Sequence, residues 1–166
     1  TIFEELIRKF NEANNEEAGE HYTPRDVVEL MADLIFVPIK DQIKDATYSC
    51  YDGACGTGGM LIEAIRYMKG DKLTYGRIYG QEKNLATSAI ARMNLFLHGA
   101  KDFRVTQGDT LRSPNYLWRG SLQTFDCVVA NPPFSLKNWG AEQFGSDIYG
   151  RNLWGCPTDS NGDFAW

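Results

Sequence analysis

The sequence predicts an α/β fold, an open, doubly wound and mainly parallel sheet. From residue 47 onward, short β-prone runs alternate with helical segments, a pattern typical of parallel strands joined by right-handed crossovers. Hydrophobic residues make up 43% and aromatic residues 13% of the chain, which supports a real core. The four strands that can be recognised are too few to cover such a sheet. We therefore expect a fold that lacks its last strands.

The first 22 residues predict a helix and a linker ahead of the main domain. Apolar side chains recur at helical spacing over residues 1–13, and a polar stretch follows over residues 14–20. We expect residues 1–22 to lead into a ligand site and residues 23–166 to form the main domain, truncated at its C-terminal end.

Residues 23–26 give a start signal for the next helix. Thr23 is the expected N-cap, Pro24 would be the first helical residue, and Asp26 would lie near the positive end of the helix dipole. We expect the buried stripe of this helix to contain Val27, Met31 and Leu34.

The alternating part predicts four strands with two helices among them. The expected strands cover residues 47–51, 77–80, 103–107 and 125–130. The first helix would end at Gly70, and the second would cover residues 85–98 with Gly99 directly after it. The buried faces are expected to consist of Leu61, Ala64, Ile65 and Met68 in the first helix and of Ala86, Ile90, Met93 and Leu97 in the second.

Residues with ligand-binding chemistry follow each predicted strand. A glycine cluster, residues 53–59, follows Asp52, and its glycines would let the backbone approach a ligand closely. Asp52 would repel a pyrophosphate and better suits a cationic or amine-bearing ligand. Glu82 is placed to accept both hydroxyls of a ribose, and Asp109 could accept from an adenine amino group. Ligands of doubly wound sheets bind at the carboxyl ends of the strands, where the strand order reverses, so these positions should form one site.

Asn131-Pro132-Pro133-Phe134 is the most informative stretch of the chain. Two prolines forbid further ladder pairing, so the preceding strand must stop and give way to a stiff turn. The turn would hold the Asn131 amide oxygen and the Pro132 carbonyl side by side, next to the aromatic ring of Phe134. A planar base with an amino group could be gripped there. The alternative is a strand that ends in prolines, with a packed phenylalanine.

Together these motifs resemble the Rossmann-like class I S-adenosylmethionine-dependent methyltransferases. Asn131 to Phe134 is similar to the catalytic motif of amino methyltransferases that modify adenine N6. Residues 19–25, 52–59 and 161–166 resemble the modification subunit of type I restriction–modification systems. Two departures stand out: Gly53 occupies a position where the family usually has proline, and the family's subunit is much longer at both ends.

The resemblance implies a role for each motif residue. The residues implied to contact the cofactor S-adenosylmethionine are Glu20, His21, Tyr22, Thr23, Pro24, Arg25, Asp52, Gly56, Thr57, Gly58, Gly59, Glu82 and Asp109. Within this set, Asp52 would lie near the amino acid part, Glu82 would hold the ribose, and Asp109 would hold the adenine. The residues implied to bind the target base and catalyse methyl transfer are Asn131, Pro132, Pro133 and Phe134. No metal ion is implied.

The implied function is methylation of adenine N6 in DNA, with the target adenine flipped out of the duplex. The formal charge of −5 argues against independent DNA binding, because phosphate contacts normally require a basic surface. A specificity subunit would therefore recognise the sequence, and a restriction subunit would complete the system. Three alternatives stay open: methylation of a protein glutamine, methylation of cytosine N4, and a non-catalytic module that binds cofactor and docks a DNA-recognition subunit.

The expected compartment is the cytoplasm. The four cysteines include no Cys-x-x-Cys pair, which makes a zinc site unexpected and a reducing environment the default. No run of about 18 apolar residues and no leader peptide is visible, so we expect no membrane association.

Overall fold

The computed structural model describes Glu5, Lys9 and residues 23–43, 47–68 and 77–166. The chain divides into two compact units. We call residues 23–107 and 124–130 the sheet unit, and residues 108–123 and 131–166 the loop unit. Apart from Glu5 and Lys9, the predicted N-terminal helix and linker lie outside the described residues, and so do the site candidates Glu20, His21 and Tyr22.

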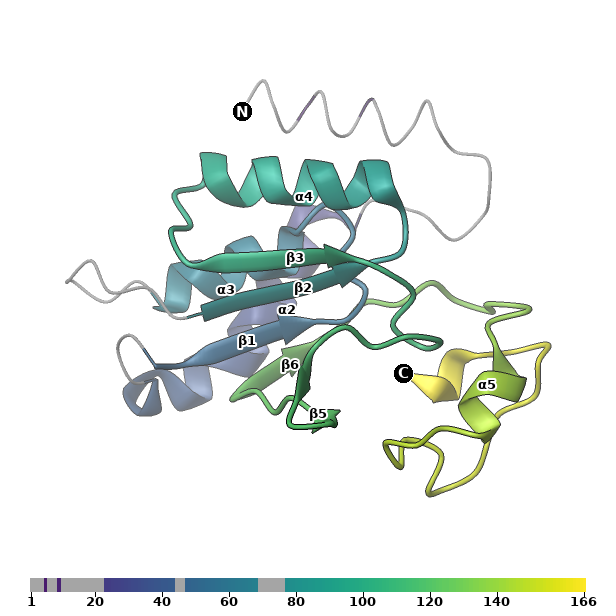
Figure 1. Cartoon of the computed structure of the whole chain (residues 1–166). Coiled ribbons are helices and arrows are strands. Elements are labelled where there is room, and N and C mark those ends of the chain that lie inside the picture. The colour runs from purple at the N-terminus through teal and green to yellow at the C-terminus, as the bar shows by residue number, and fades with distance from the viewer. Residues whose placement is uncertain (1–4, 6–8, 10–22, 44–46, 69–76) are drawn as a thin grey trace. The chain divides into compact units, whose positions relative to one another are not determined.

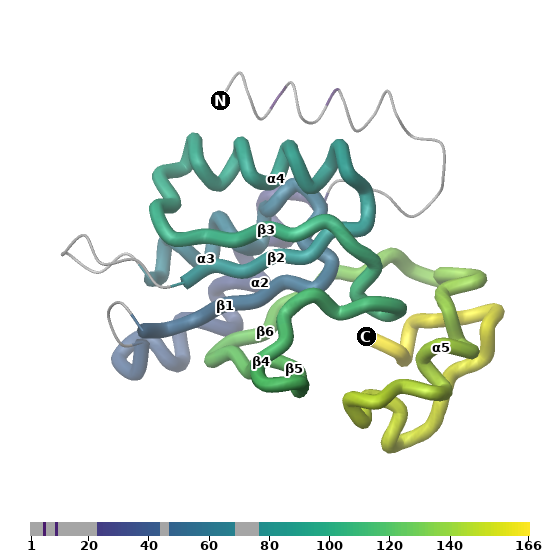
Figure 2. The backbone as a smooth tube through the Cα atoms, viewed as in Figure 1, coloured from purple at the N-terminus to yellow at the C-terminus, as the bar shows by residue number. Residues whose placement is uncertain are grey.

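A four-stranded parallel sheet forms the centre of the sheet unit (Figures 1 and 2). Its strands are β1 (Ser49–Asp52), β2 (Arg77–Glu82), β3 (Phe103–Gln107) and β6 (Cys127–Val129), in the order β3-β2-β1-β6. The predicted α/β fold with a parallel sheet is confirmed. The chain moves outward from β1 to β3 and then returns to the other side of β1. The strand order therefore reverses between β1 and β6, the place where ligands bind in such sheets.

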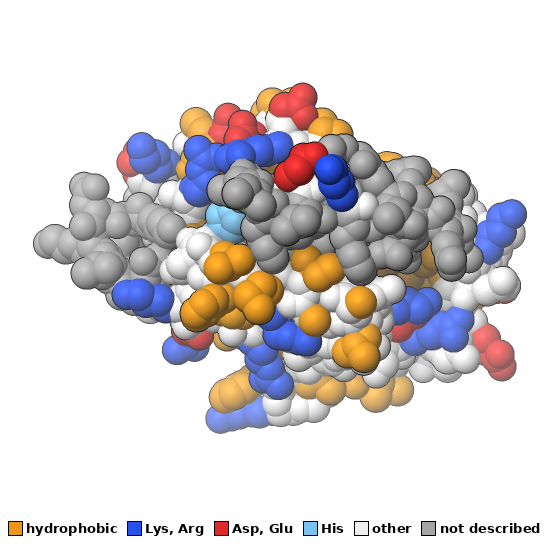
Figure 3. Space-filling model, turned by 90° about the horizontal axis from the view of Figure 1, so that it is seen from above, with side chains coloured by type: hydrophobic (Ala, Val, Ile, Leu, Met, Phe, Trp, Pro, Cys, Tyr) orange, Lys and Arg blue, Asp and Glu red, His pale blue; other side chains and the backbone are white. Residues whose placement is uncertain are grey.

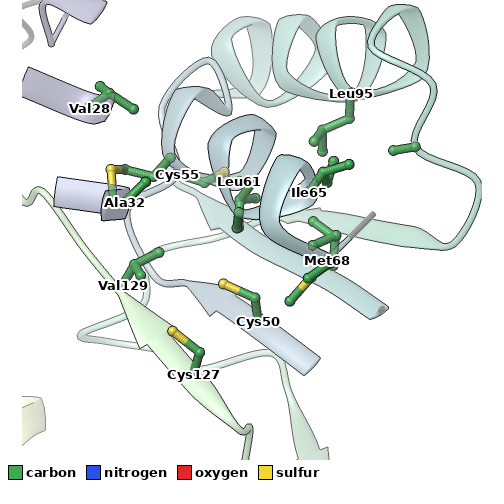
Figure 4. Packing of buried hydrophobic residues seen from close by; sticks show 14 of the residues in the cluster. Val28, Ala32, Cys50, Cys55, Leu61, Ile65, Met68, Leu95, Cys127 and Val129 are labelled. Atoms are coloured by element: carbon green, nitrogen blue, oxygen red, sulfur yellow. The ribbon is translucent and has the colours of Figure 1, made fainter. Parts of the chain in front are cut away.

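Three helices of the sheet unit share one hydrophobic core with the strands (Figure 4). They are α2 (Arg25–Phe36), α3 (Gly59–Met68) and α4 (Leu85–Leu97), and a short 3-10 helix, η1 (Val37–Gln42), follows α2. Cys50 of β1 pairs in register with Cys127 of β6 and Ile78 of β2, and all three are buried. The predicted buried face of α3 is confirmed at all four positions, Leu61, Ala64, Ile65 and Met68.

The details predicted for α2 are wrong in two respects. Pro24 and not Thr23 is the N-cap, with an extended ψ of 142°, so the helix begins at Arg25 and not at Pro24. The buried residues are Val28, Ala32 and Phe36, whereas Val27 and Leu34 are exposed and Met31 is half-buried. This helix has apolar residues on most of its circumference, so packing against α3, not periodicity, selects the inner stripe.

The bounds of α4 agree with the prediction to within one residue, but its predicted buried face is wrong. The helix buries Ser88, Ala91, Asn94 and Leu95, while Ala86, Met93 and Leu97 are exposed and Ile90 is half-buried. Two of the buried residues are polar, which the apolar pattern could not indicate. Figure 3, seen from the side on which α4 lies, shows hydrophobic side chains gathered on this face with Lys and Arg side chains among them. The exposed hydrophobic residues of α4 include Leu85, Met93, Phe96 and Leu97.

The loop unit combines a small hairpin with irregular segments. Strands β4 (Leu117–Trp118) and β5 (Ser121–Leu122) pair antiparallel around Arg119-Gly120, whose φ angles are 51° and 83°. Two positive φ values in succession define the type I′ geometry that suits a two-residue hairpin. The sequence prediction missed this hairpin.

The rest of the loop unit packs around one buried tryptophan. Trp139 is 1% exposed, contacts Phe144 edge-on at 5.2 Å between ring centroids, and shares a small core with Leu111. The unit also contains α5 (Ala141–Gly145) and the 3-10 helix η2 (Asp163–Ala165). Among the described residues, no helix combines the length and the apolar character needed to cross a membrane.

Candidate active site

A tight glycine turn joins the end of β1 to the start of α3. Gly56 and Gly58 have φ angles of 52° and 88°, a left-handed backbone that glycine adopts without steric cost. The Gly58 N–H donates to the Cys55 carbonyl at 2.7 Å, and the Cys55 N–H donates to the Gln81 carbonyl of β2 at 3.1 Å. A Cβ on Gly56 would meet no atom within 4 Å. The turn therefore presents its backbone to open space at the carboxyl end of the sheet.

Two carboxylates lie under this turn. Asp52 is 2% exposed, and its Oδ1 accepts from the Ala54 N–H at 3.0 Å. Glu82 accepts from the Gly56 N–H at 3.0 Å and from the Asn84 N–H at 2.8 Å, so it ties the glycine turn to the start of α4. Burial raises the pKa of Asp52 to about 7, and the Glu82 charge adds to the increase. The hydrogen bond from the Ala54 N–H acts in the opposite direction and lowers this pKa. A cationic group placed here would favour the ionised form of Asp52.

Two residues that support the turn were not predicted from the sequence. Asn94 of α4 is buried, and its Nδ2 donates to the Thr57 carbonyl at 3.0 Å. Gly80 of β2 lies directly beneath the turn, since a Cβ there would be 3.0 Å from the Cys55 Sγ. The only signal for Asn94 was a polar residue in an Ala- and Leu-rich helix. A glycine inside a strand, as at Gly80, often marks close backbone approach.

The first turn of α2 lies close to the glycine turn. A Cβ on Gly59, the first residue of α3, would lie 3.9 Å from the Val28 Cγ2. Thr23 and Pro24 immediately precede this helix, and Arg25 begins it with a side chain bonded to Glu29 at 3.1 Å. The sheet unit therefore brings the start of α2 to the same region as the glycine turn. The predicted contacts of Thr23, Pro24 and Arg25 with a cofactor stay predictions.

Asp109 organises its own turn in the loop unit. Its Oδ1 accepts from the Leu111 N–H at 3.1 Å and the Arg112 N–H at 3.2 Å, and its carbonyl accepts from the Ser113 N–H at 2.7 Å. The other carboxylate oxygen lies 3.7 Å from the Arg112 Nε. Asp109 thus has a defined structural role, and its predicted contact with an adenine ring stays a prediction.

The segment from Asn131 to Phe134 follows β6, which ends at Val129 as the prolines predicted. Asn131, Pro132 and Pro133 are half-buried and lie outside helices and strands, whereas the Phe134 side chain is 76% exposed. The alternative of a packed phenylalanine is therefore wrong. An exposed aromatic ring at the end of a proline-stiffened turn is suited to stack on a planar partner.

The predicted site residues are thus distributed over both units. The sheet unit brings together Asp52, the glycine turn and Glu82, and the loop unit contains Asp109 and residues 131–134. Asp109 lies two residues after the last residue of β3, and Asn131 lies two residues after the last residue of β6. In the chain, Asp109 and Asn131 therefore each come shortly after the carboxyl end of a different strand of the same sheet.

This parallel sheet, with a glycine turn after β1 and an acid at the end of β2, has the fold of the class I S-adenosylmethionine-dependent methyltransferases. A solved structure assigned to that class, from Listeria monocytogenes, superimposes on 84% of the chain with a TM-score of 0.62 at 18% identity. The sequence model of the N-6 DNA methylase family matches residues 1–166. The chain belongs to this family.

The relatives include methylase subunits of type I restriction enzymes. The MjaVII methylase subunit of Methanocaldococcus jannaschii is 30% identical over 99% of this chain, and the MpnII methylase subunit of Mycoplasma pneumoniae is 31% identical over 99%. A solved methyltransferase subunit of a type I restriction–modification system from Streptococcus thermophilus is 32% identical over 98% of the chain, with a TM-score of 0.79. The chain spans 32%, 31% and 33% of these three proteins, respectively.

Proposed function

We propose that this chain forms the catalytic core of a modification subunit that transfers a methyl group from S-adenosylmethionine to N6 of adenine in DNA. The family and the similarity to type I methylase subunits support this proposal. The observation that carries it is the exposed ring of Phe134 directly after Asn131-Pro132-Pro133, in the segment that follows β6. Strand β6 pairs with β1, the strand that precedes the glycine turn.

The glycine turn and its carboxylates fit the proposed cofactor. The backbone of Gly56 faces open space where a ligand could approach, and Asp52 is a buried carboxylate whose charged form a cationic amino group would stabilise. Glu82 would hold the ribose hydroxyls, because it is an acid at the end of the second strand of the sheet, the place where such an acid accepts from a ribose. When bound, S-adenosylmethionine supplies an activated methyl group on a sulfonium.

The turn from Asn131 to Phe134 would act on the target base. The exocyclic amine of adenine is a poor nucleophile because its lone pair is delocalised into the ring. The Asn131 side-chain oxygen and the Pro132 carbonyl would accept its two N–H bonds and draw the nitrogen toward tetrahedral geometry, which localises the lone pair. Phe134 would stack on the ring of the flipped base, whose extrusion from the duplex costs a few kcal/mol. Alignment of this kind contributes about 7–11 kcal/mol when the geometry is right.

The proposed partners are DNA, a specificity subunit and a restriction subunit. The net charge of −5 supports a separate DNA-recognition subunit, because a chain without a basic excess gains little affinity from counterion release. The four cysteines are unpaired thiols, which agrees with a cytoplasmic location for the complex.

The test is methyl transfer by the full-length protein with its specificity subunit. Tritiated S-adenosylmethionine should label adenine-containing DNA, and Asn131→Ala should lower this rate by at least about 100-fold while the dissociation constant of the cofactor changes less than about twofold. Label in protein would favour glutamine methylation, and label on cytosine would favour the N4 reaction. No transfer with intact cofactor binding would favour the non-catalytic module. Equal loss of transfer and of cofactor binding in Asn131→Ala would reject the proposed roles.

A further inference from the structure

The backbone directly after Phe134 is in an unusual conformation. Ser135 has a φ of 53° and Asn138 a φ of 51°, so two non-glycine residues within four positions are left-handed. Side chains disfavour this region, and residues hold it only where the surrounding structure enforces it. The turn that carries Asn131 to Phe134 therefore continues into a segment whose shape depends on external restraints.

Three of those restraints come from residues 158–163 of the same unit, and Arg112 adds a bond to the Asn138 carbonyl. The Ser135 N–H donates to the Asp163 Oδ1 at 2.7 Å, and the Asn138 N–H donates to the Asp159 carbonyl at 3.0 Å. Between them, the Gly162 N–H donates to the Leu136 carbonyl at 3.0 Å. The N–H groups of Ser135 and Asn138 thus both donate to residues 158–163. Of these three bonds, the one from Ser135 has a side-chain acceptor, and the other two have main-chain acceptors.

The position of Asp163 is itself fixed by its neighbours. Its N–H donates to the Asn161 Oδ1 at 2.9 Å. Gly162 lies flat on the ring of Trp139, since a Cβ at Gly162 would be 2.7 Å from the Trp139 Cγ. The buried Trp139 is held in turn by its Nε1, which donates to the Thr158 carbonyl at 2.9 Å. The carboxylate of Asp163 therefore approaches Ser135 from a rigid support.

We propose that Asp163 is a positioning residue for the target base. The Ser135 N–H belongs to the same planar peptide as the Phe134 carbonyl, so a bond to this N–H fixes the plane of that peptide. Fixing that plane orients the backbone of Phe134, and with it the exposed ring and the preceding acceptors. Asp163 acts through Ser135 and touches neither base nor cofactor. This inference rests on the proposed function.

The experiment compares Asp163→Ala with Asp163→Asn in the full-length protein assembled with its specificity subunit. Alanine removes the acceptor, and asparagine keeps one side-chain oxygen for the Ser135 N–H. Asp163→Ala should lower kcat for adenine methylation about 10- to 100-fold, the effect of a misplacement near 1 Å, with KM for cofactor unchanged within about twofold. Asp163→Asn should recover most of that kcat. Glu142→Ala, which removes an exposed acid of the same unit, is the control and should behave as wild type.

A second variant and a second readout separate positioning from general stability. Glycine adopts left-handed backbone freely, so adding Ser135→Gly to Asp163→Ala should recover at least about threefold in kcat. With 2-aminopurine in place of the target adenine, Asp163→Ala should leave the extruded base less quenched than wild type, because Phe134 stacks less well.

Four outcomes would overturn the inference. They are a wild-type kcat in Asp163→Ala, an equal loss in Asp163→Asn, a parallel loss of cofactor binding, and no recovery with Ser135→Gly. Failure of the proposed function is distinguishable from these, because Asn131→Ala would then retain adenine methylation whatever the Asp163 variants do.

Discussion

Asp52→Asn should stabilise the folded protein above neutral pH while it weakens cofactor binding. Asp52 is buried, and its carboxylate is disfavoured by lost solvation and by the Glu82 charge. Asparagine has nearly the same shape, carries no charge and keeps an oxygen that can accept from the Ala54 N–H. The same replacement removes the anion proposed to face the cationic amino group of S-adenosylmethionine, so stability and binding should change in opposite directions.

The magnitude follows from the two pKa values of Asp52. The pKa is about 7 in the folded protein and 3.8 in the reference state, a difference of about 3. At about 1.4 kcal/mol per pKa unit, the buried charge costs about 4 kcal/mol when fully ionised. Between pH 4 and 7 the folded state binds more protons than the unfolded state, so stability falls as the pH rises through this window. Asp52→Asn should remove this fall and gain about 2–4 kcal/mol at pH 8 and little at pH 4.

Urea unfolding at pH 4, 6 and 8, followed by circular dichroism, measures the effect. The control is Asp102→Asn, because the Asp102 side chain is 68% exposed and its ion pair with Arg77 at 3.7 Å should contribute less than about 1 kcal/mol. Calorimetry should show at least about tenfold weaker cofactor binding for Asp52→Asn. A stability gain equal at pH 4 and 8, or a loss at pH 8, would refute the buried-charge reasoning.

Two further substitutions test the support of the glycine turn. Gly80→Ala should lower the free energy of unfolding by about 1–3 kcal/mol, because the new Cβ would lie 3.0 Å from the Cys55 Sγ. Gly59→Ala is the control, because its new Cβ would lie 3.9 Å from its nearest neighbour. An equal loss of stability in Gly59→Ala would contradict the packing argument. Asn94→Ala should raise the cofactor dissociation constant about tenfold by releasing the Thr57 carbonyl. Asn94→Asp, which lacks the N–H donor, should show the same increase in the dissociation constant by calorimetry. Wild-type cofactor affinity in either variant would exclude a role of Asn94 in supporting the glycine turn.

The four strands and their parallel sheet could be predicted because local signals agreed with the global fold. Strand β3 was predicted at its observed bounds, and the other three strands lie within two residues of their predicted ends. Glycines and prolines punctuate these segments: the turn at Gly56 and Gly58 and the stop before Pro132 each follow from backbone chemistry alone. Such restrictions act within a few residues, so a single sequence reveals them.

Which helix faces are buried could not be predicted where apolar residues surround the helix. The apolar sides of α2 and α3 are equally pronounced, but only that of α3 was predicted at the positions that are buried. In α2, packing buries a neighbouring part of the apolar side, and α4 has apolar residues on both sides. In α4, Asn94 is buried because its side chain bonds to the Thr57 carbonyl of a turn distant in sequence. Only the tertiary structure brings such a partner within reach.

The candidate site, too, could be predicted only where the signals are local in the sequence. The residue types at Asp52, Glu82 and residues 131–134 indicated ligand chemistry. In the structure, Asp52 and Glu82 are the last residues of β1 and β2, and residues 131–134 follow β6 of the same sheet. The bond between Ser135 and Asp163 joins positions 28 apart, in a segment without periodicity. Nothing in the sequence around either residue indicated this pairing.

Hydrogen bonds between residues 135–138 and 158–163 form a fixed base in the loop unit, and residues 140–157 form a loop that this base closes. The two ends of this loop are held together by main-chain hydrogen bonds and by the Trp139 ring. Phe144 and Arg151 of this loop must be kept, because Phe144 packs on Trp139 and Arg151 donates to the Thr110 and Leu111 carbonyls. Because lengthening a closed loop adds little entropic cost, insertions elsewhere in the loop should leave its base undisturbed. Its exposed Ile148, Leu153 and Trp154 are thus free to diversify in evolution, and a single proteolytic cut among them should leave the two fragments associated.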